Sequence, residues 1–343
     1  MSAHDRAYGA LLGLAIGDAL GMPTQYTPRS QIEGRYGVLT GFEPGPPDNF
    51  ISRGMPAGRV TDDTDQAVIL GEMLVAGQGR VDPDRFARAL LAWEQRMISI
   101  GSQDLLGPST RRALALVAEG TSPELTGRSG STNGAAMRVA PVGVAVPAEP
   151  LGALVDAVFE SAYVTHNTTV AIAGASAVAA AVSAGIAGAS LGKALETAIA
   201  AAELGARRGF YFAGGDVAAR CRWALELVRG KREDEALGLV YTLVGTGVAT
   251  NEAVPAALAV CSVAPDDPWK VCLLAASLGG DCDTVGAMAG AIMGACHGAS
   301  AFPQDAVATL EKANPDLKLE ALAEALLALR NEALLALRNK ASG

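Results

Sequence analysis

No stretch of this sequence alternates apolar and polar residues over the length of a β-strand. Its apolar residues recur at helical spacing instead, in runs divided by Gly, Pro, Ser and Asp. Only 5% of the residues are aromatic, whereas Ala and Gly are abundant, which favours closely packed helices over a β-sandwich. The pattern predicts an all-α fold. Because no break in composition marks a boundary, we expect a single compact domain over residues 1–343.

Helical spacing also places the individual helices. Residues 21–60 interrupt the series, because they are dense in Pro and Gly and show little helical periodicity. A loop of this length inside a compact domain is usually functional, and we expect it to act as a lid. Residues 324–331 recur as 332–339, which predicts a repeat-bearing C-terminal helix over 317–340. The other predicted helices are 3–20, 63–77, 84–99, 109–119, 134–140, 150–163, 167–184, 190–203, 215–229, 233–243, 251–263, 268–278 and 284–297.

Charge and composition restrict the partners that the chain can bind. The net charge of −9 and the absence of a Lys/Arg run argue against nucleic acid. Residues 167–192 carry no charge, but they are mostly Ala, Gly, Ser and Thr, which predicts a buried central helix and no membrane span. Five cysteines without a CxxC pair indicate reduced thiols, and the first 21 residues lack the basic segment of a signal peptide. We expect a cytoplasmic monomer.

Two acidic clusters are the strongest chemical signal. Residues 61–65 read Thr-Asp-Asp-Thr-Asp and run directly into an apolar helical stretch. Residues 279–284 read Gly-Gly-Asp-Cys-Asp-Thr and open onto a second such stretch, more than 200 residues later. Folded face to face, the clusters would offer four to five carboxylates and two hydroxyls. Oxygen ligands of this kind suit two Mg²⁺ or Mn²⁺ ions.

The first cluster also has a simpler interpretation. Thr61 could cap its helix, with the aspartates complementing the helix dipole. Three carboxylates in four residues exceed what a cap needs, however, and they repel one another. The first cluster also resembles the aspartate-rich motif of prenyl-diphosphate enzymes, which are all-α and use Mg²⁺. That motif has the spacing DDxxD, whereas residues 62–65 have DDxD.

Five motifs together resemble the ADP-ribosylglycohydrolases, which include the dinitrogenase-reductase-activating glycohydrolases and the ADP-ribosyl-acceptor hydrolases. The resemblance implies a compact orthogonal helical bundle, two divalent cations, and ADP-ribose or an ADP-ribosylated acceptor as the partner. The motifs span about residues 5–300 in a similar order and spacing. They are Gly17-Asp18-Ala19-Leu20-Gly21, residues 61–65, residues 133–138 (Asn-Gly-Ala-Ala-Met-Arg), Thr165-His166 and residues 279–284.

The same resemblance assigns candidate site residues. Asp65 is expected to support the metal site or to cap its helix. In the family, Gly usually precedes the position of Asn133, and here that residue is Thr132. The expected ligand-binding residues are Ser131, Thr132, Asn133, Gly134 and His166. The expected metal ligands are Thr61, Asp62, Asp63, Asp281, Asp283 and Thr284.

The catalytic group is where this chain departs from the family. The family usually places a Glu four residues after the Gly-Asp-Ala-Leu-Gly motif, and here that position is Gln25. An amide cannot accept a proton as a base, so the base must come from elsewhere, either from a metal-bound hydroxide or from Asp104. The expected catalytic residues are Asp104, Asp62 and Gln25.

The leading hypothesis is a dimetal hydrolase that cleaves the glycosidic bond at the anomeric carbon of an ADP-ribosyl group. Two alternatives remain. One is hydrolysis of a free small riboside, and the other, favoured by Gln25, is a non-catalytic protein that binds ADP-ribose.

Overall fold

The computed structural model describes residues 1–342, and it is helical throughout, with no β-sheet in that range. Only three isolated β-bridges occur there, one of which joins Thr27 to Gly280. The α-helices are α1 (Ala3–Gly21), α2 (Arg29–Tyr36), α3 (Asp62–Ala76), α4 (Pro83–Ser99), α5 (Pro108–Ala118), α6 (Pro123–Thr126), α7 (Gly134–Met137), α8 (Ala140–Ala145), α9 (Leu151–Ala162), α10 (Thr169–Ile186), α11 (Leu191–Gly205), α12 (Val217–Val228), α13 (Glu233–Leu239), α14 (Thr250–Val263), α15 (Pro268–Ala276), α16 (Cys282–His297), α17 (Gln304–Ala313) and α18 (Leu319–Ser342). The all-α prediction is confirmed.

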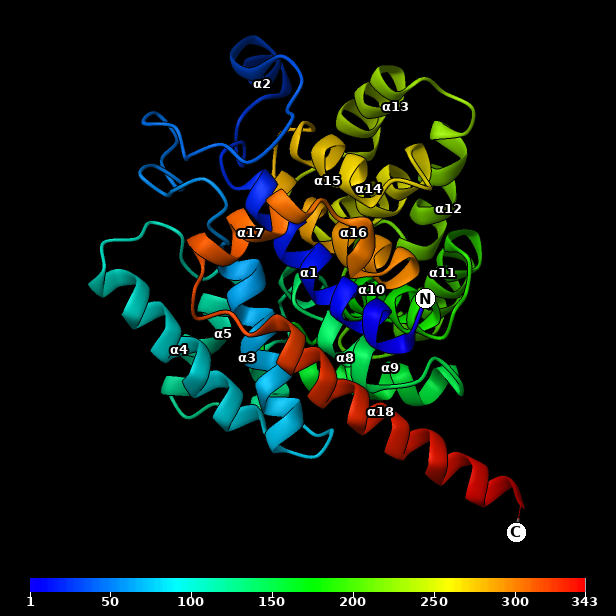
Figure 1. Ribbon diagram of the computed structural model, residues 1–343. Coiled ribbons are helices and arrows are strands. Elements are labelled where there is room, and N and C mark those ends of the chain that lie inside the picture. Colours follow the sequence, from blue (N-terminus) through cyan, green and yellow to red (C-terminus); the bar gives the residue numbers. More distant parts are fainter. Residues whose placement is uncertain (343) are drawn as a thin grey trace.

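Helices α1 and α16 form the centre of the molecule, where they lie side by side (Figure 1). A Cβ atom added at Gly13 would lie 2.1 Å from the carbonyl oxygen of Gly290, and one at Gly17 would lie 2.0 Å from that of Gly286. The two helices therefore meet backbone to backbone. The contact runs antiparallel, from Gly9 opposite Gly294 to Gly21 opposite Asp283.

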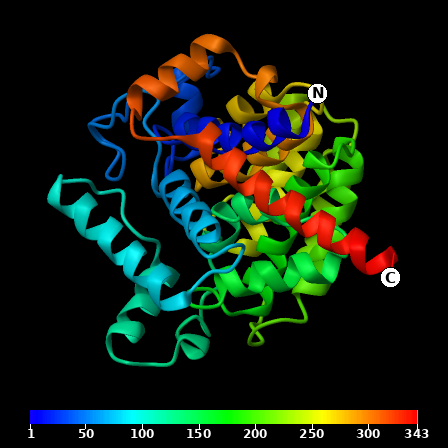
Figure 2. The ribbon, with the colours of Figure 1, turned by 60° about the horizontal axis from the view of Figure 1, so that its bottom comes forward.

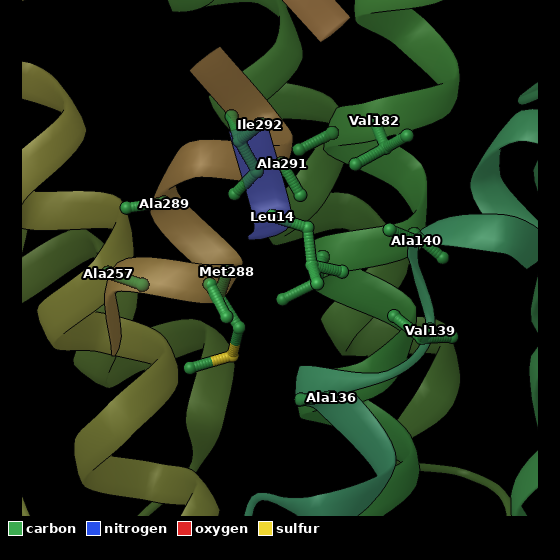
Figure 3. Close-up of a cluster of buried hydrophobic side chains, with 14 of the residues drawn as sticks. Leu14, Ala136, Val139, Ala140, Val182, Ala257, Met288, Ala289, Ala291 and Ile292 are labelled. Carbon is green, nitrogen blue, oxygen red and sulfur yellow. The ribbon is translucent and has the colours of Figure 1, made fainter. Parts of the chain in front are cut away.

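Small side chains let the other helices approach this pair closely. Figure 3 shows Leu14 of α1 among residues of α16, α8 and α10, most of which are Ala, Val or Ile. The central helix α10 is long and apolar enough to cross a membrane, but 94% of that stretch is buried inside the protein. The predicted buried helix over 167–184 is thus confirmed. All five cysteines are free and buried.

Most predicted helices are found within two residues of their expected ends, but four predictions need correction. The region 21–60 contains α2, which has a single buried residue, Ile32, and so no apolar stripe to reveal it. Its Arg29 and Glu33 form an ion pair one turn apart at 2.9 Å. The segment 134–140 divides into α7 and α8, 233–243 ends in a π-helical turn over Val240–Val244, and α6 and α17 were not predicted.

The C-terminal helix α18 packs across α1, α3 and α8, and its far end projects from the body (Figure 2). In the first copy of the repeat, Leu326 is buried and the guanidinium of Arg330 donates to the carbonyl oxygens of Val146 and Ser183. In the second copy, Leu335 is 59% exposed. Eight residues exceed two helical turns, so the apolar stripe rotates away from the core between copies.

Candidate functional site

A small cavity of about 100 Å³ lies where the N-termini of α3 and α16 meet. Its wall draws on segments from the whole chain, including both ends of the 21–60 region and the loop before α5. The lining residues are Gln25, Tyr26, Ile51, Asp62, Asp63, Gln103, Asp104, Leu105, Gly107, Pro108, Thr110, Thr132, Asn133, Gly134, Met137, Val248, Asp281, Asp283 and Thr284.

The start of α3 is fastened by a buried carboxylate of α1. Asp18 accepts hydrogen bonds from the backbone N–H of Thr61 at 3.0 Å and of Thr64 at 3.1 Å. The hydroxyl of Thr61 donates to Asp18 Oδ1 at 2.7 Å, and the hydroxyl of Thr64 donates to Oδ2. Burial raises the pKa of Asp18 to about 6, although these four hydrogen bonds lower it in part. The side chain therefore fixes how Asp62 and Asp63 enter the cavity.

The start of α16 is fastened mainly through its backbone. Gly279 and Gly280 have positive φ angles of 86° and 74°, which glycine adopts without strain. The N–H of Asp281 donates to the carbonyl oxygen of Thr246 at 2.7 Å. One side-chain contact completes this start, since Asn133 Nδ2 donates to Asp281 Oδ2 at 2.5 Å.

The two acidic helix starts touch directly. The hydroxyl of Thr284 donates to Asp63 Oδ2 at 3.3 Å. Burial raises the pKa of Asp62, Asp63 and Asp283 well above the usual range, and repulsion among neighbouring carboxylates raises them further. The pKa of Asp281 is also raised by burial, while its bond from Asn133 lowers it. The cavity thus concentrates negative charge that has no cationic side chain beside it in the lining.

Two carboxylate oxygens of this cluster lack partners. Asp63 Oδ1 and Asp283 Oδ1 are buried and accept no hydrogen bond. Unpartnered carboxylate oxygens in an acidic cavity are the donors that hard divalent cations take. The oxygens are gathered but not yet arranged as a coordination shell, since no three Asp, Glu, His or Cys side chains among residues 1–342 form a group that could hold a metal ion.

Most of the residues predicted for the site lie in the cavity wall, but three do not. Thr61 faces Asp18 instead, Ser131 presents its carbonyl oxygen to Thr250, and His166 is fully buried behind the wall. Asp65 also points elsewhere, because its carboxylate accepts from Trp93 Nε1 at 2.9 Å and pairs with Arg59 at 3.3 Å. Helical geometry separates Asp65 from Asp63, since side chains two positions apart on a helix point to different faces.

Behind the wall, a chain of hydrogen bonds links the two sides of the cavity. Gln66 Nε2 donates to Asp62 Oδ2 at 2.6 Å, and Arg138 donates to Gln66 Oε1 at 2.7 Å. Arg138 also donates to the hydroxyl of Thr165. His166 then connects this chain to Thr132 in the loop before α7.

The ring of His166 forms hydrogen bonds with Thr165 Oγ1 at 2.8 Å and with Thr132 Oγ1 at 3.0 Å. Burial lowers the pKa of His166 well below its usual value, and the charge of Arg138 lowers it further, so the imidazole is neutral. His166 therefore acts on the cavity through Thr132.

Sequence reasoning did not assign roles to Asp18, Arg138 or Tyr26. Asp18 and Arg138 both lie in family motifs. A charged residue among apolar neighbours was the signal that could have identified them. Nothing in the sequence indicates that Tyr26 faces the cavity.

Gln25 lies in the cavity wall and is 3% exposed. Its backbone carbonyl oxygen accepts a hydrogen bond from Asn49 Nδ2 at 2.7 Å. Its side-chain Nε2 is buried without a hydrogen-bond partner. Asp104 lies in the same wall, and burial raises the pKa of its carboxylate well above the usual range.

Comparison with known proteins places this site in a family. The ADP-ribosylglycohydrolase family matches residues 1–334. The uncharacterized protein YegU of Escherichia coli (strain K12) is 36% identical over 95% of this chain and 97% of its own length. The ADP-ribosyl-[dinitrogen reductase] glycohydrolase of Rhodospirillum rubrum is 27% identical over 96% of this chain and 97% of its own. A solved structure named ADP-ribosylglycohydrolase-related protein complex superposes with a TM-score of 0.69 at 29% identity, covering 96% of this chain and 99% of that one.

The chain therefore belongs to the ADP-ribosylglycohydrolase family. Its family membership marks it as an enzyme that hydrolyses ADP-ribose linkages. The resemblance found in the five motifs is confirmed along the whole chain.

Proposed function

We propose that this protein is a dimetal-dependent hydrolase that cleaves the bond at the anomeric carbon of an ADP-ribosyl group on an acceptor. One observation carries the proposal: the acidic starts of α3 and α16 line the same cavity, joined by the hydrogen bond from Thr284 to Asp63. Four aspartates at one point, three of them buried and Asp62 partly buried, are unfavourable without a cationic partner.

Two Mg²⁺ or Mn²⁺ ions are the cofactors that fit this donor set. The residues that would hold them are Asp62, Asp63, Asp281, Asp283 and Thr284, all in the wall, with Thr61 close behind it. Bound ions would supply positive charge that holds the ribose hydroxyls and lowers the pKa of a water molecule. Asp63 and Asp283 are the first choice, because each has an unpartnered oxygen.

A carboxylate of the chain then takes the proton of the attacking water. Gln25 cannot do so, since an amide is not a base near neutral pH. Asp104 is proposed for this role, with Asp62 as the alternative. Asp62 Oδ2 already accepts from Gln66, which holds that side chain in place. Water adds to the anomeric carbon, the bond to the acceptor breaks, and the proton held on the carboxylate returns to the leaving acceptor.

The cavity is too small to hold ADP-ribose as it stands. Ligand pockets usually measure roughly 300–1,000 Å³, and this one encloses about 100 Å³. Gln25, Tyr26 and Ile51 of the 21–60 region form part of its wall, together with Gln103 and Asp104. We propose that the 21–60 region opens to admit substrate and closes to exclude water.

The first test removes one acidic residue. Asp283→Ala should abolish Mn²⁺ binding in calorimetry and release of ADP-ribose, while circular dichroism still shows a helical protein. Asp65→Asn is the matched control from the first acidic cluster. Its carboxylate faces Arg59 and Trp93, so Mn²⁺ binding should be retained. Full activity of a chelator-treated parent would rule out the dimetal mechanism.

A further inference from the structure

Two aromatic rings stand at the mouth of the cavity. Tyr26 lines the cavity yet is 47% exposed, and Phe50, which is 67% exposed, meets it edge to face with 5.9 Å between ring centroids. Ile51, the neighbour of Phe50, also lines the cavity. Tyr26 is therefore the aromatic residue of the described wall that reaches solvent, and Phe50 packs against it from outside the wall.

The backbone holds Tyr26 in this position at a cost. Its φ angle is 55°, in the left-handed region that bulky residues avoid, and only Gln78 shares this among the non-glycine residues described. Hydrogen bonds on both sides fix the turn: Tyr26 N–H donates to Gly280 O at 2.6 Å, and Gly280 N–H donates to Thr27 O. The strained residue is thereby tied directly to the start of α16.

Two other exposed rings are covered by guanidinium groups of the chain itself. Arg128 lies over Phe210 and Arg220 over Trp223, at 5.4 and 5.5 Å from the ring centroids. Among residues 1–342, no guanidinium covers Tyr26 or Phe50 in this way. The face of a phenol ring carries negative potential, which attracts cationic and electron-poor groups.

We propose that Tyr26 and Phe50 form a platform for the leaving group and that they favour flat, electron-poor leaving groups. This inference rests on the proposed function, which puts the scissile bond at the four aspartates. An acceptor on a macromolecule must reach solvent from that point, and these rings line the route. Stacking on an aromatic face suits a guanidinium or a pyridinium, whereas an aliphatic hydroxyl gains little from it.

The test compares three substrates that share ADP-ribose and differ in leaving group. They are an ADP-ribosylated guanidino compound, NAD⁺ as the pyridinium case, and ADP-ribosylserine as the aliphatic case. Tyr26→Leu and Phe50→Ala should lower kcat/KM about tenfold on whichever flat substrate the parent hydrolyses, with about a twofold change at most on ADP-ribosylserine. Tyr26→Phe should keep the parent's selectivity. Trp223→Ala, which removes another exposed ring, should leave kcat/KM unchanged on the flat substrate and on ADP-ribosylserine.

The outcomes separate the two proposals. An equal loss on all substrates, or weaker calorimetric binding of free ADP-ribose, would overturn the platform, because the rings would then serve the fold or the nucleotide. Unchanged selectivity in both variants would overturn it as well. A parent that hydrolyses none of the three substrates with saturating Mg²⁺ would overturn the proposed function and the platform with it. Phe50→Ala leaves the strained turn of Tyr26 unchanged, so misfolding at that turn cannot explain its effect.

Discussion

The starts of α3 and α16 resemble each other in sequence but are held in different ways. At α3, one buried carboxylate, Asp18, accepts four hydrogen bonds from Thr61 and Thr64. At α16 no side chain caps the helix, and the segment is placed by two positive-φ glycines and by backbone contact with α1. The two acidic helix starts are thus held differently. Hydrogen bonds to a buried carboxylate fix the start of α3, whereas close packing of backbones fixes the start of α16.

This difference determines how each end should fail when it is mutated. A steric contact between backbones has no room to relax, so a single methyl group displaces a whole helix. A hydrogen-bonded anchor loses its bonds one at a time, so damage is graded. Both ends meet at Thr284 and Asp63, so either failure should reach the same cavity.

The largest effect is expected at the contact between the two central helices. Gly13→Ala should reduce the free energy of unfolding by roughly 3 kcal/mol or more, because the new Cβ would sit 2.1 Å from Gly290 O. Chemical denaturation measures this change. Gly192→Ala is the control, because that helical glycine has nothing within 4 Å. Equal stability of the two variants would show that α1 and α16 can separate without cost.

A smaller loss is expected when the anchor of α3 is neutralised. Asp18→Asn should cost about 2–3 kcal/mol of stability, since one amide oxygen cannot accept from four donors and the amide N–H₂ opposes some of them. Calorimetry should also show weaker Mn²⁺ binding. Asp216→Asn changes an exposed cap of α12 and should cost about 1 kcal/mol or less. If both substitutions cost the same, the anchor is no more than an ordinary cap.

The next effect concerns the side-chain contact between Asn133 and Asp281 at the start of α16. Asn133→Ala should weaken ADP-ribose binding by ~1–3 kcal/mol, because Asp281 loses its hydrogen-bond donor. His166→Ala should also weaken binding, since it removes the support of Thr132. Isothermal titration calorimetry measures both affinities. Unchanged affinity in both variants would show that neither residue contributes to the ligand site.

The smallest effect is expected for the residue that departs from the family. Gln25→Glu places a carboxylate beside the proposed metal site and should tighten Mn²⁺ binding about tenfold, because ligand charge sets affinity. Without Mn²⁺ the same change should lower stability, since it adds a like charge to a buried acidic cavity. Thermal unfolding with and without Mn²⁺ measures both the loss of stability without the ion and the gain of stability when it binds. Destabilisation that Mn²⁺ does not reverse would place position 25 outside the metal site.

The sequence predicted the helices well where an apolar stripe was present. It failed for α2, whose sequence offers Ile32 alone to the core, and it missed α17 although Ala306 and Leu310 give that helix a buried face. The pairing of the two acidic clusters followed from their shared chemistry, because both carry Asp and Thr at the start of a helix.

Side-chain direction was the part that could not be predicted. Asp65 shares a motif with Asp62 and Asp63 but faces Trp93, since helical rotation separates neighbours that look alike in sequence. His166 is one hydrogen bond behind the wall, through Thr132. The strained turn of Tyr26 depends on contacts with Gly280, more than 250 residues later, which no local pattern contains.

The glycine contact between α1 and α16 also sets the order in which the protein can be completed during synthesis. Nearly every residue of α1 from Ala7 onward is buried in the finished protein, yet its facing partner begins at Cys282. Helix α1 therefore leaves the ribosome long before the helix that covers it, and its apolar surface stays open until α16 emerges. Contacts between such distant segments slow folding, and here the acidic cavity cannot close before α16 has arrived. The emerging chain carries an unfinished site for most of its synthesis.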